Sequence, residues 1–130
     1  MILKNSFSKS EHLCGEKRIS RLFTQGDAFI AYPLRVVFLI ETKIDLEYSS
    51  VLVSVPKKRF KRAVKRNRLK RLIREAYRLN KQLLIEKLTG KQMQIHMAFN
   101  YVSDDELDYA TVEKKMKISL GRLIDKIEAL

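Results

Sequence analysis

Large apolar residues recur at every second position in several stretches of the chain. The clearest lies in residues 93–101, where five large apolar or aromatic side chains alternate with four other residues. Strict alternation of this kind is typical of a β-strand. Residues 34–40 and 48–55 also predict strands, because β-branched and aromatic residues are dense in both, and Pro56 ends the second. A further short strand is expected near residues 29–30.

A spacing of three and four residues predicts a short helix over residues 16–25. Ile19, Leu22 and Phe23 fall at positions i, i+3 and i+4 and form one apolar stripe. Gly26 follows directly and suits the left-handed conformation that often ends a helix. Residues 1–15, which precede this helix, are polar with scattered apolar anchors and are expected to form an ordered arm or turn.

A longer amphipathic helix is predicted from Ala63, about 23 residues and roughly 35 Å long. Thr89 and Gly90 are expected to end it. Its apolar positions are spaced for one buried face and comprise Leu69, Leu72, Ile73, Ala76, Leu83 and Leu84. At 100° per residue the opposite side collects basic residues, namely Lys70, Arg71, Arg74, Arg78 and Lys81.

A last helix is predicted at the C-terminal end of the chain, because apolar residues recur there at helical spacing from Val112 to Ile127. Its start has two possible signals. Ser103 and Glu106 resemble a capping box, and Asp108 is an alternative cap. The elements therefore follow the order α-β-β-(β)-α-β-α, which predicts a single α/β domain over residues 1–130, with helices packed on a sheet in a two-layer sandwich.

Composition adds few constraints on the class of protein. No apolar run approaches the 18–20 residues or so that cross a bilayer, and no signal-peptide core begins the chain. The single cysteine, Cys14, has no internal disulfide partner and is expected to be buried or half-buried. A cytoplasmic location is the default expectation.

The net positive charge is concentrated in residues 57–81. The chain carries 27 Lys and Arg against 15 Asp and Glu, a formal net charge of +12. Thirteen of the bases and one acid, Glu75, lie in this stretch, so the other 105 residues are balanced with 14 of each sign. A merely solvated helix would intersperse more Glu for pairing at i, i+4. An otherwise neutral body with one intensely basic segment indicates a site for a polyanion.

Residues able to perform bond chemistry do not gather in the sequence. There is no glycine-rich phosphate loop, nucleophile elbow or His/Asp/Glu cluster. His96, at an alternate position of a predicted strand, is expected to be structural or on the surface. The acids at positions 104–106 are more typical of a helix start than of a metal site. We therefore expect neither a catalytic residue nor a metal ligand in this polypeptide.

RNA is the polyanion that fits best. A membrane-surface helix would need exposed large apolar residues, whereas the apolar face of this helix is expected to pack on the sheet. A zipper helix that reads DNA would need sustained heptads, which are missing. Guanidinium groups match phosphate oxygens two at a time, and the amide of Asn67, between Arg66 and Arg68, suits a 2′-hydroxyl or a base edge.

Residues 57–77 closely resemble the signature of the bacterial ribonuclease P protein subunit, and they read Lys-Lys-Arg-Phe-Lys-Arg-Ala-Val-Lys-Arg-Asn-Arg-Leu-Lys-Arg-Leu-Ile-Arg-Glu-Ala-Tyr. Residues 21–26 look like the first helix of that family, and residues 54–58 look like the strand before the signature. The resemblance implies a ribosomal-S5-like α/β sandwich with a left-handed β-α-β crossover. It also implies a ribonucleoprotein that removes 5′ leaders from precursor tRNA.

The resemblance further implies which partners and residues act. In that family the RNA subunit is the catalyst and binds most of the Mg²⁺. The partners would be ribonuclease P RNA and precursor tRNA, with no membrane and no obligate protein partner. The RNA-binding residues that we expect are Lys57, Lys58, Arg59, Lys61, Arg62, Lys65, Arg66, Asn67, Arg68, Lys70, Arg71 and Arg74.

A cleft for the 5′ leader is implied between the first helix and the sheet. Phe23 matches an aromatic residue of that cleft, and Ile19 replaces another. Val37, with Phe38 next to it, stands where the family has a strand aromatic. Core packing is an open alternative for both phenylalanines. A ribosomal-type RNA-binding protein without a processing role is the alternative function, and a nuclease that acts without RNA is a more distant one.

Overall fold

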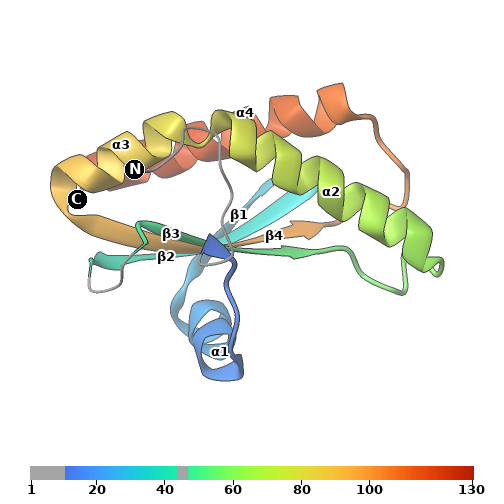
Figure 1. Cartoon of the computed structure of the whole chain (residues 1–130), viewed down its shortest axis with the longest axis horizontal. Coiled ribbons are helices and arrows are strands. Elements are labelled where there is room, and N and C mark those ends of the chain that lie inside the picture. The colour runs from blue at the N-terminus through green and yellow to red at the C-terminus, as the bar shows by residue number, and fades with distance from the viewer. Residues whose placement is uncertain (1–10, 44–46) are drawn as a thin grey trace.

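A four-stranded sheet forms the middle of the computed structural model, which describes residues 11–43 and 47–130 (Figure 1). The spatial order is β1-β2-β4-β3, and the two pairings β1–β2 and β2–β4 are antiparallel. The strands are β1 Asp27–Ala31, β2 Leu34–Thr42, β3 Ser49–Ser54 and β4 Met93–Tyr101. The three strands predicted from their residue patterns and the further one expected near residues 29–30 are confirmed.

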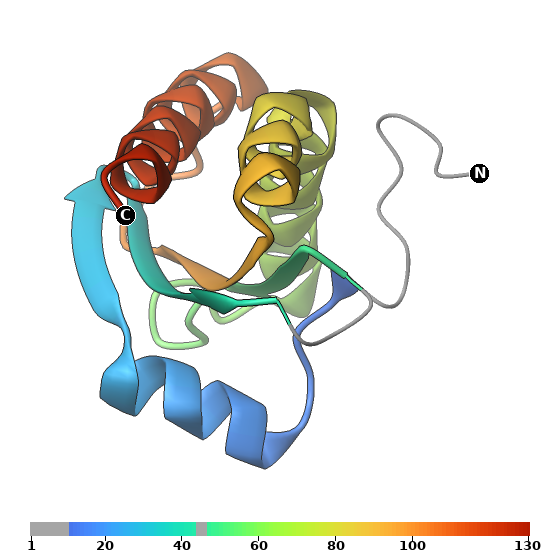
Figure 2. The same cartoon turned by 90° about the vertical axis from the view of Figure 1, so that its left-hand side faces the viewer.

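Three helices cover one face of the sheet and one helix lies on the other (Figures 1 and 2). The helices are α1 Glu16–Gln25, α2 Ala63–Asn80, α3 Gln82–Lys91 and α4 Tyr109–Glu128. Helices α2, α3 and α4 form the upper layer in Figure 1, and α1 lies alone below the sheet. Strand β3 runs parallel to β4, and α2 and α3 connect them. This arrangement confirms the predicted fold class, and the hand of the crossover stays a prediction.

Successive side chains of each strand point to opposite faces of the sheet, so they pack into two separate apolar cores. The main core lies between the sheet and the three helices and includes Phe38, Phe99 and Met116. A smaller cluster lies under α1 and consists of buried Leu13, Leu22, Val37 and Ala98 with partly buried neighbours. Val51, Val53 and Val55 all belong to the main core, as their spacing predicts.

The single long helix predicted from Ala63 is wrong, because the structure divides it at Lys81 into α2 and α3. The side-chain amide of Asn80 donates to the carbonyl oxygen of Ala76 at 2.8 Å, which competes with the backbone for that acceptor. Thr89 and Gly90 do not end the helix either. Helix α3 continues to Lys91, and Gln92 takes the left-handed conformation with φ 54° and ψ 44°.

Three smaller expectations also change. Gly26 is extended (φ −79°, ψ 164°) and not left-handed. Asp108 is the cap of α4, since its side chain accepts the Thr111 N–H at 2.9 Å, so the capping-box alternative fails. Cys14 is exposed and not buried. Of the predicted arm, residues 1–10 lie outside the described part of the chain, while Leu13 is buried and its N–H donates to the Val51 carbonyl.

Candidate nucleic-acid interface

The basic residues before and along α2 form an outward-facing cationic surface. Phe60 anchors the preceding loop, because its side chain is buried and its ring centroid lies 5.8 Å from that of Tyr101. Lys57, Lys58, Lys61 and Arg62 in the same loop are exposed. The side chains of seven basic residues make no ion pair or hydrogen bond with any other described residue, and we call them the open cations: Lys57, Lys58, Lys61, Arg62, Lys70, Arg71 and Arg74. Asn67 is exposed beside them on α2.

Arg66, an expected RNA-binding residue, also makes hydrogen bonds within the protein. One nitrogen of its guanidinium group donates to the carbonyl oxygens of Phe60 and Lys61, both at 2.8 Å. The side chain therefore fixes the loop against the first turn of α2. This contact could not be seen in the sequence, because it depends on how the loop folds back on the helix. Arg68 and Arg71 consequently give cleaner tests of RNA binding than Arg66.

Three other predicted RNA-binding residues already have acidic partners within the chain. Arg59 pairs with Asp104 at 2.9 Å. Lys65 and Arg68 both pair with Glu106, at 3.4 and 3.1 Å. The partners lie in the loop between β4 and α4, more than thirty residues away in the chain.

Lys81 does not belong to the cationic face, contrary to its predicted place. Its side chain is 8% exposed and its ammonium group contacts both carboxylate oxygens of Glu11, at 2.6 and 2.8 Å. The helix divides at this residue, which turns the side chain inward. Arg78 is also engaged, because Glu75 accepts two hydrogen bonds from its guanidinium group one turn away.

Helix α1 sits on the other face of the sheet over a small apolar seat. Leu22 is fully buried against Val37 and Ala98, and Ile19 is partly buried beside them. Gly26 ends the helix where the chain passes close to β2. A Cβ atom there would lie 2.5 Å from the Leu22 carbonyl oxygen and 2.6 Å from that of Phe38, closer than any side chain tolerates. Glycine is therefore required for a close approach and not for a left-handed turn.

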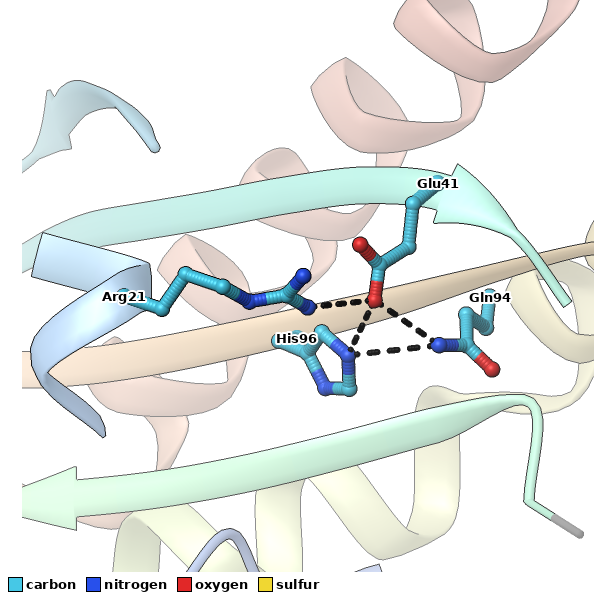
Figure 3. Close-up of polar contacts among 4 residues, drawn as sticks. All are labelled: Arg21, Glu41, Gln94 and His96. Carbon is cyan, nitrogen blue, oxygen red and sulfur yellow. Dashed lines mark hydrogen bonds and ion pairs between the residues drawn. The ribbon is translucent and has the colours of Figure 1, made fainter. Parts of the chain in front are cut away.

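A polar cluster ties α1 to the sheet beside this apolar seat, and Figure 3 shows its four side chains. One carboxylate oxygen of Glu41, on β2, contacts three donors: Arg21 of α1 at 2.5 Å, and Gln94 and His96 of β4 at 2.9 Å each. A carboxylate only accepts, so Nε2 of His96 carries the proton. The other ring nitrogen, Nδ1, is buried without a hydrogen-bond partner among the described residues. His96 is thus structural, as expected.

The pKa of Glu41 reflects this environment. Burial raises the pKa of the carboxyl group, and the hydrogen bonds from Arg21, Gln94 and His96 together with the charge of Arg21 outweigh burial and lower the pKa to about 2. The ionised carboxylate is therefore the form that the fold stabilises. Sequence reasoning missed this cluster, because its members come from three separate elements.

The four expected cleft residues separate when the sheet forms. Ile19 of α1 and Val37 of β2 pack together between the helix and the sheet, and Phe23 of α1 is 45% exposed. Phe38 lies on the opposite face, buried in the main core at 5.9 Å from the Phe29 ring. Because successive strand residues point to opposite faces, Val37 and Phe38 cannot line one cleft. The expectation for Phe38 is therefore wrong, and core packing is its observed role.

A row of polar side chains on the α1 face was not predicted. Arg35 is two residues from Val37 and so shares its face, and it pairs in register with Asn100 of β4, which pairs with Ser54 of β3. All three side chains are half-exposed and make no hydrogen bond or ion pair with another described residue. Counting in twos from Val37 could have identified Arg35, whereas the other two required the strand register.

Neither a metal centre nor a membrane span is found in the described part of the chain. No three His, Cys, Asp or Glu side chains among residues 11–43 and 47–130 gather as a metal ion would require. None of the helices seen there is long and apolar enough to span a bilayer. The arrangement suits an extended anion on the α2 side and a single-stranded polymer on the α1 side.

Comparison with known proteins gives consistent matches. The model of the family described as Ribonuclease P matches residues 7–124. The ribonuclease P protein component of Porphyromonas gingivalis strain W83 is 52% identical over 120 residues, which cover 92% of this chain and 88% of that protein. That of Chlorobaculum tepidum is 38% identical over 75% of this chain and 68% of its own length. The solved RNase P protein of Staphylococcus aureus shares the fold, with a TM-score of 0.67 and 16% identity over 88% of this chain and 96% of that one.

Proposed function

Because the chain belongs to the ribonuclease P protein family and acts as a protein component of ribonuclease P in tRNA processing, we propose that its cationic surface holds the RNA subunit of that enzyme. The open cations carry this proposal. They lie on one side of a rigid helix and its leading loop, and the fold leaves them without acidic partners among the described residues. Closely spaced cations without acidic partners repel one another, and bound phosphates would neutralise that repulsion.

The α1 side of the sheet is proposed as the surface for the 5′ leader of precursor tRNA. Phe23 offers an exposed ring on which a single-stranded base can stack. Arg35 and Asn100 add a cation and an amide on the same face of the sheet. Ile19 and Val37 pack α1 against the sheet and do not need to contact the leader themselves.

We assign the hydrolysis to the RNA subunit, with Mg²⁺ bound by that RNA. The described residues do not fit a metal ion, because no three suitable side chains gather there, so no protein side chain is given a part in coordination. The protein then contributes affinity for the substrate and electrostatic support for the folded RNA. The assembly is proposed to act in the cytoplasm.

Reconstitution with a bacterial ribonuclease P RNA tests the proposal. Leader removal from precursor tRNA is measured at low Mg²⁺ with the wild-type protein, with Arg68→Ala and with Arg71→Ala. Both variants are expected to weaken assembly about tenfold, since each loses charge-assisted bonds to phosphate. If about seven cations contact phosphates, the affinity of the wild-type protein falls by roughly three to four decades between 50 and 200 mM salt.

Lys87→Ala is the matched control, because it removes one positive charge from α3, at the other end of the helical layer from the start of α2 (Figure 1). Its exposed pair with Glu128 is worth little to stability. Equal losses for Lys87→Ala and Arg71→Ala would mean that net charge alone matters. Wild-type processing by both arginine variants would contradict the proposed function.

A further inference from the structure

Two acids of the loop between β4 and α4 face the N-terminal half of α2 and the basic loop before it. Glu106 bridges Lys65 and Arg68, which are one turn apart on the helix, and Asp104 pairs with Arg59. Both acids line a hollow of about 330 Å³ together with Arg59, Lys65, Phe60 and Lys61. Acids are unexpected here, since this is the surface proposed to receive RNA phosphates.

Hydrogen bonds hold the backbone of this loop in place. The hydroxyl group of buried Tyr101 donates to the Asp105 carbonyl oxygen at 2.6 Å and accepts the Leu107 N–H at 3.1 Å. The side chain of Ser103, itself buried, accepts the Asp105 N–H and the Tyr32 hydroxyl. The fold therefore positions the backbone of the loop beside α2, and only the acidic side chains are free to move.

We propose that Asp104 and Glu106 occupy two phosphate positions of the RNA-binding surface in the free protein and are displaced when RNA binds. The geometry of Glu106 supports this directly, because a carboxylate that bridges two cations one turn apart uses them as a phosphate group would. The proposal rests on the proposed function, in that it requires the surface to bind RNA.

The exposure of the pairs makes displacement feasible. The side chains of Lys65 and Arg68 are 49% and 62% exposed, and ion pairs in water contribute little to stability. Their loss costs the folded protein little, but each displaced carboxylate takes up a cation from solution and remains near the bound phosphates. Both effects lower the affinity and reduce the salt dependence of binding.

Asp105 provides a matched control within the same loop. Its carboxylate is exposed and makes no ion pair or hydrogen bond with another described residue, so Asp105→Asn changes the charge without releasing a cation. Binding of each protein to ribonuclease P RNA is measured by fluorescence anisotropy between 100 and 400 mM salt. The variants are Glu106→Gln, Asp104→Asn, Asp105→Asn, Arg68→Ala, and Arg68→Ala combined with Glu106→Gln.

We expect Glu106→Gln to increase the affinity for RNA about fivefold and to steepen the slope of log affinity against log salt by about one. Asp105→Asn should increase the affinity at most about twofold and leave the slope unchanged. Asp104→Asn should fall between them, because it releases one cation. The gain from Glu106→Gln should shrink when Arg68 is already Ala, which is the signature of a direct pair.

Each other outcome has a distinct meaning. Equal effects of Glu106→Gln and Asp105→Asn would overturn the inference, since the loop would then act by net charge alone. Weaker binding by Glu106→Gln would also overturn it, because the acid would then be orienting the cations for RNA. If Arg68→Ala leaves RNA binding unchanged, the proposed function of this surface fails first. Thermal unfolding of each variant checks that the start of α2, which has no acid of its own, is still folded.

Discussion

Replacing Glu41 by Gln removes the only charge that balances Arg21 in the cluster of Figure 3, while keeping the size of the side chain. The pKa of Glu41 falls from 4.5 to about 2 in the folded protein. Each tenfold change in proton affinity corresponds to about 1.4 kcal/mol, so the full depression corresponds to about 3 kcal/mol. The side chain retains 23% exposure, and solvent screening reduces the expected loss to about 2 kcal/mol.

The sign follows from the direction of the shift. A carboxyl group whose pKa is depressed by folding contributes its full stability above the unfolded value of 4.5 and loses it as the pH falls towards 2. The free-energy difference between the wild-type protein and Glu41→Gln should therefore be largest near pH 6.5 and fall to less than half of that at pH 3. Other carboxyl groups with lowered pKa values, such as Asp108 and Glu113, are present in both proteins and cancel.

Urea unfolding at pH 6.5 and pH 3, followed by circular dichroism, measures this difference. Glu86→Gln is the control, because Glu86 is exposed on α3 and its change should cost less than about 0.5 kcal/mol. A difference for Glu41→Gln that stays constant between the two pH values would refute the reasoning. The same result would show that the charge of Glu41 does not stabilise the contact between α1 and the sheet.

Two further predictions follow from α1 and its surroundings. Gly26→Ala should lower the free energy of unfolding by about 2 kcal/mol or more, because its Cβ atom would meet two backbone oxygens. Gly121→Ala, in α4 with open space around it, should raise the free energy of unfolding by about 0.5–1 kcal/mol. Equal shifts of the two variants in urea unfolding would contradict the close approach at Gly26. Phe23→Ala should weaken the binding of leader-bearing precursor tRNA to the reconstituted enzyme about tenfold, because the contact with one stacked base is lost. The binding of mature tRNA, which has no leader, should weaken less than twofold. Equal losses for the two RNAs would mean that Phe23 acts by packing.

The local patterns in the sequence determined most of the secondary structure. Alternation over residues 93–101 gave the central strand, and the stripe of Ile19, Leu22 and Phe23 gave the first helix, because each pattern reflects one element facing one layer. The basic stretch located the cationic surface for a similar reason. Its charges are consecutive along one loop and one helix, so no tertiary information is needed to bring them together.

Tertiary structure alone decided which of those residues are available. Lys81 looks like any other base of its stretch, yet a break in the helix turns it towards Glu11. Phe38 differs from Val37 by one position, and the side of the sheet that each faces depends on which face α1 covers. The Glu41 cluster and the acids facing α2 join residues at least twenty positions apart. Such contacts depend on strand register and loop path, which periodicity within a single element does not encode.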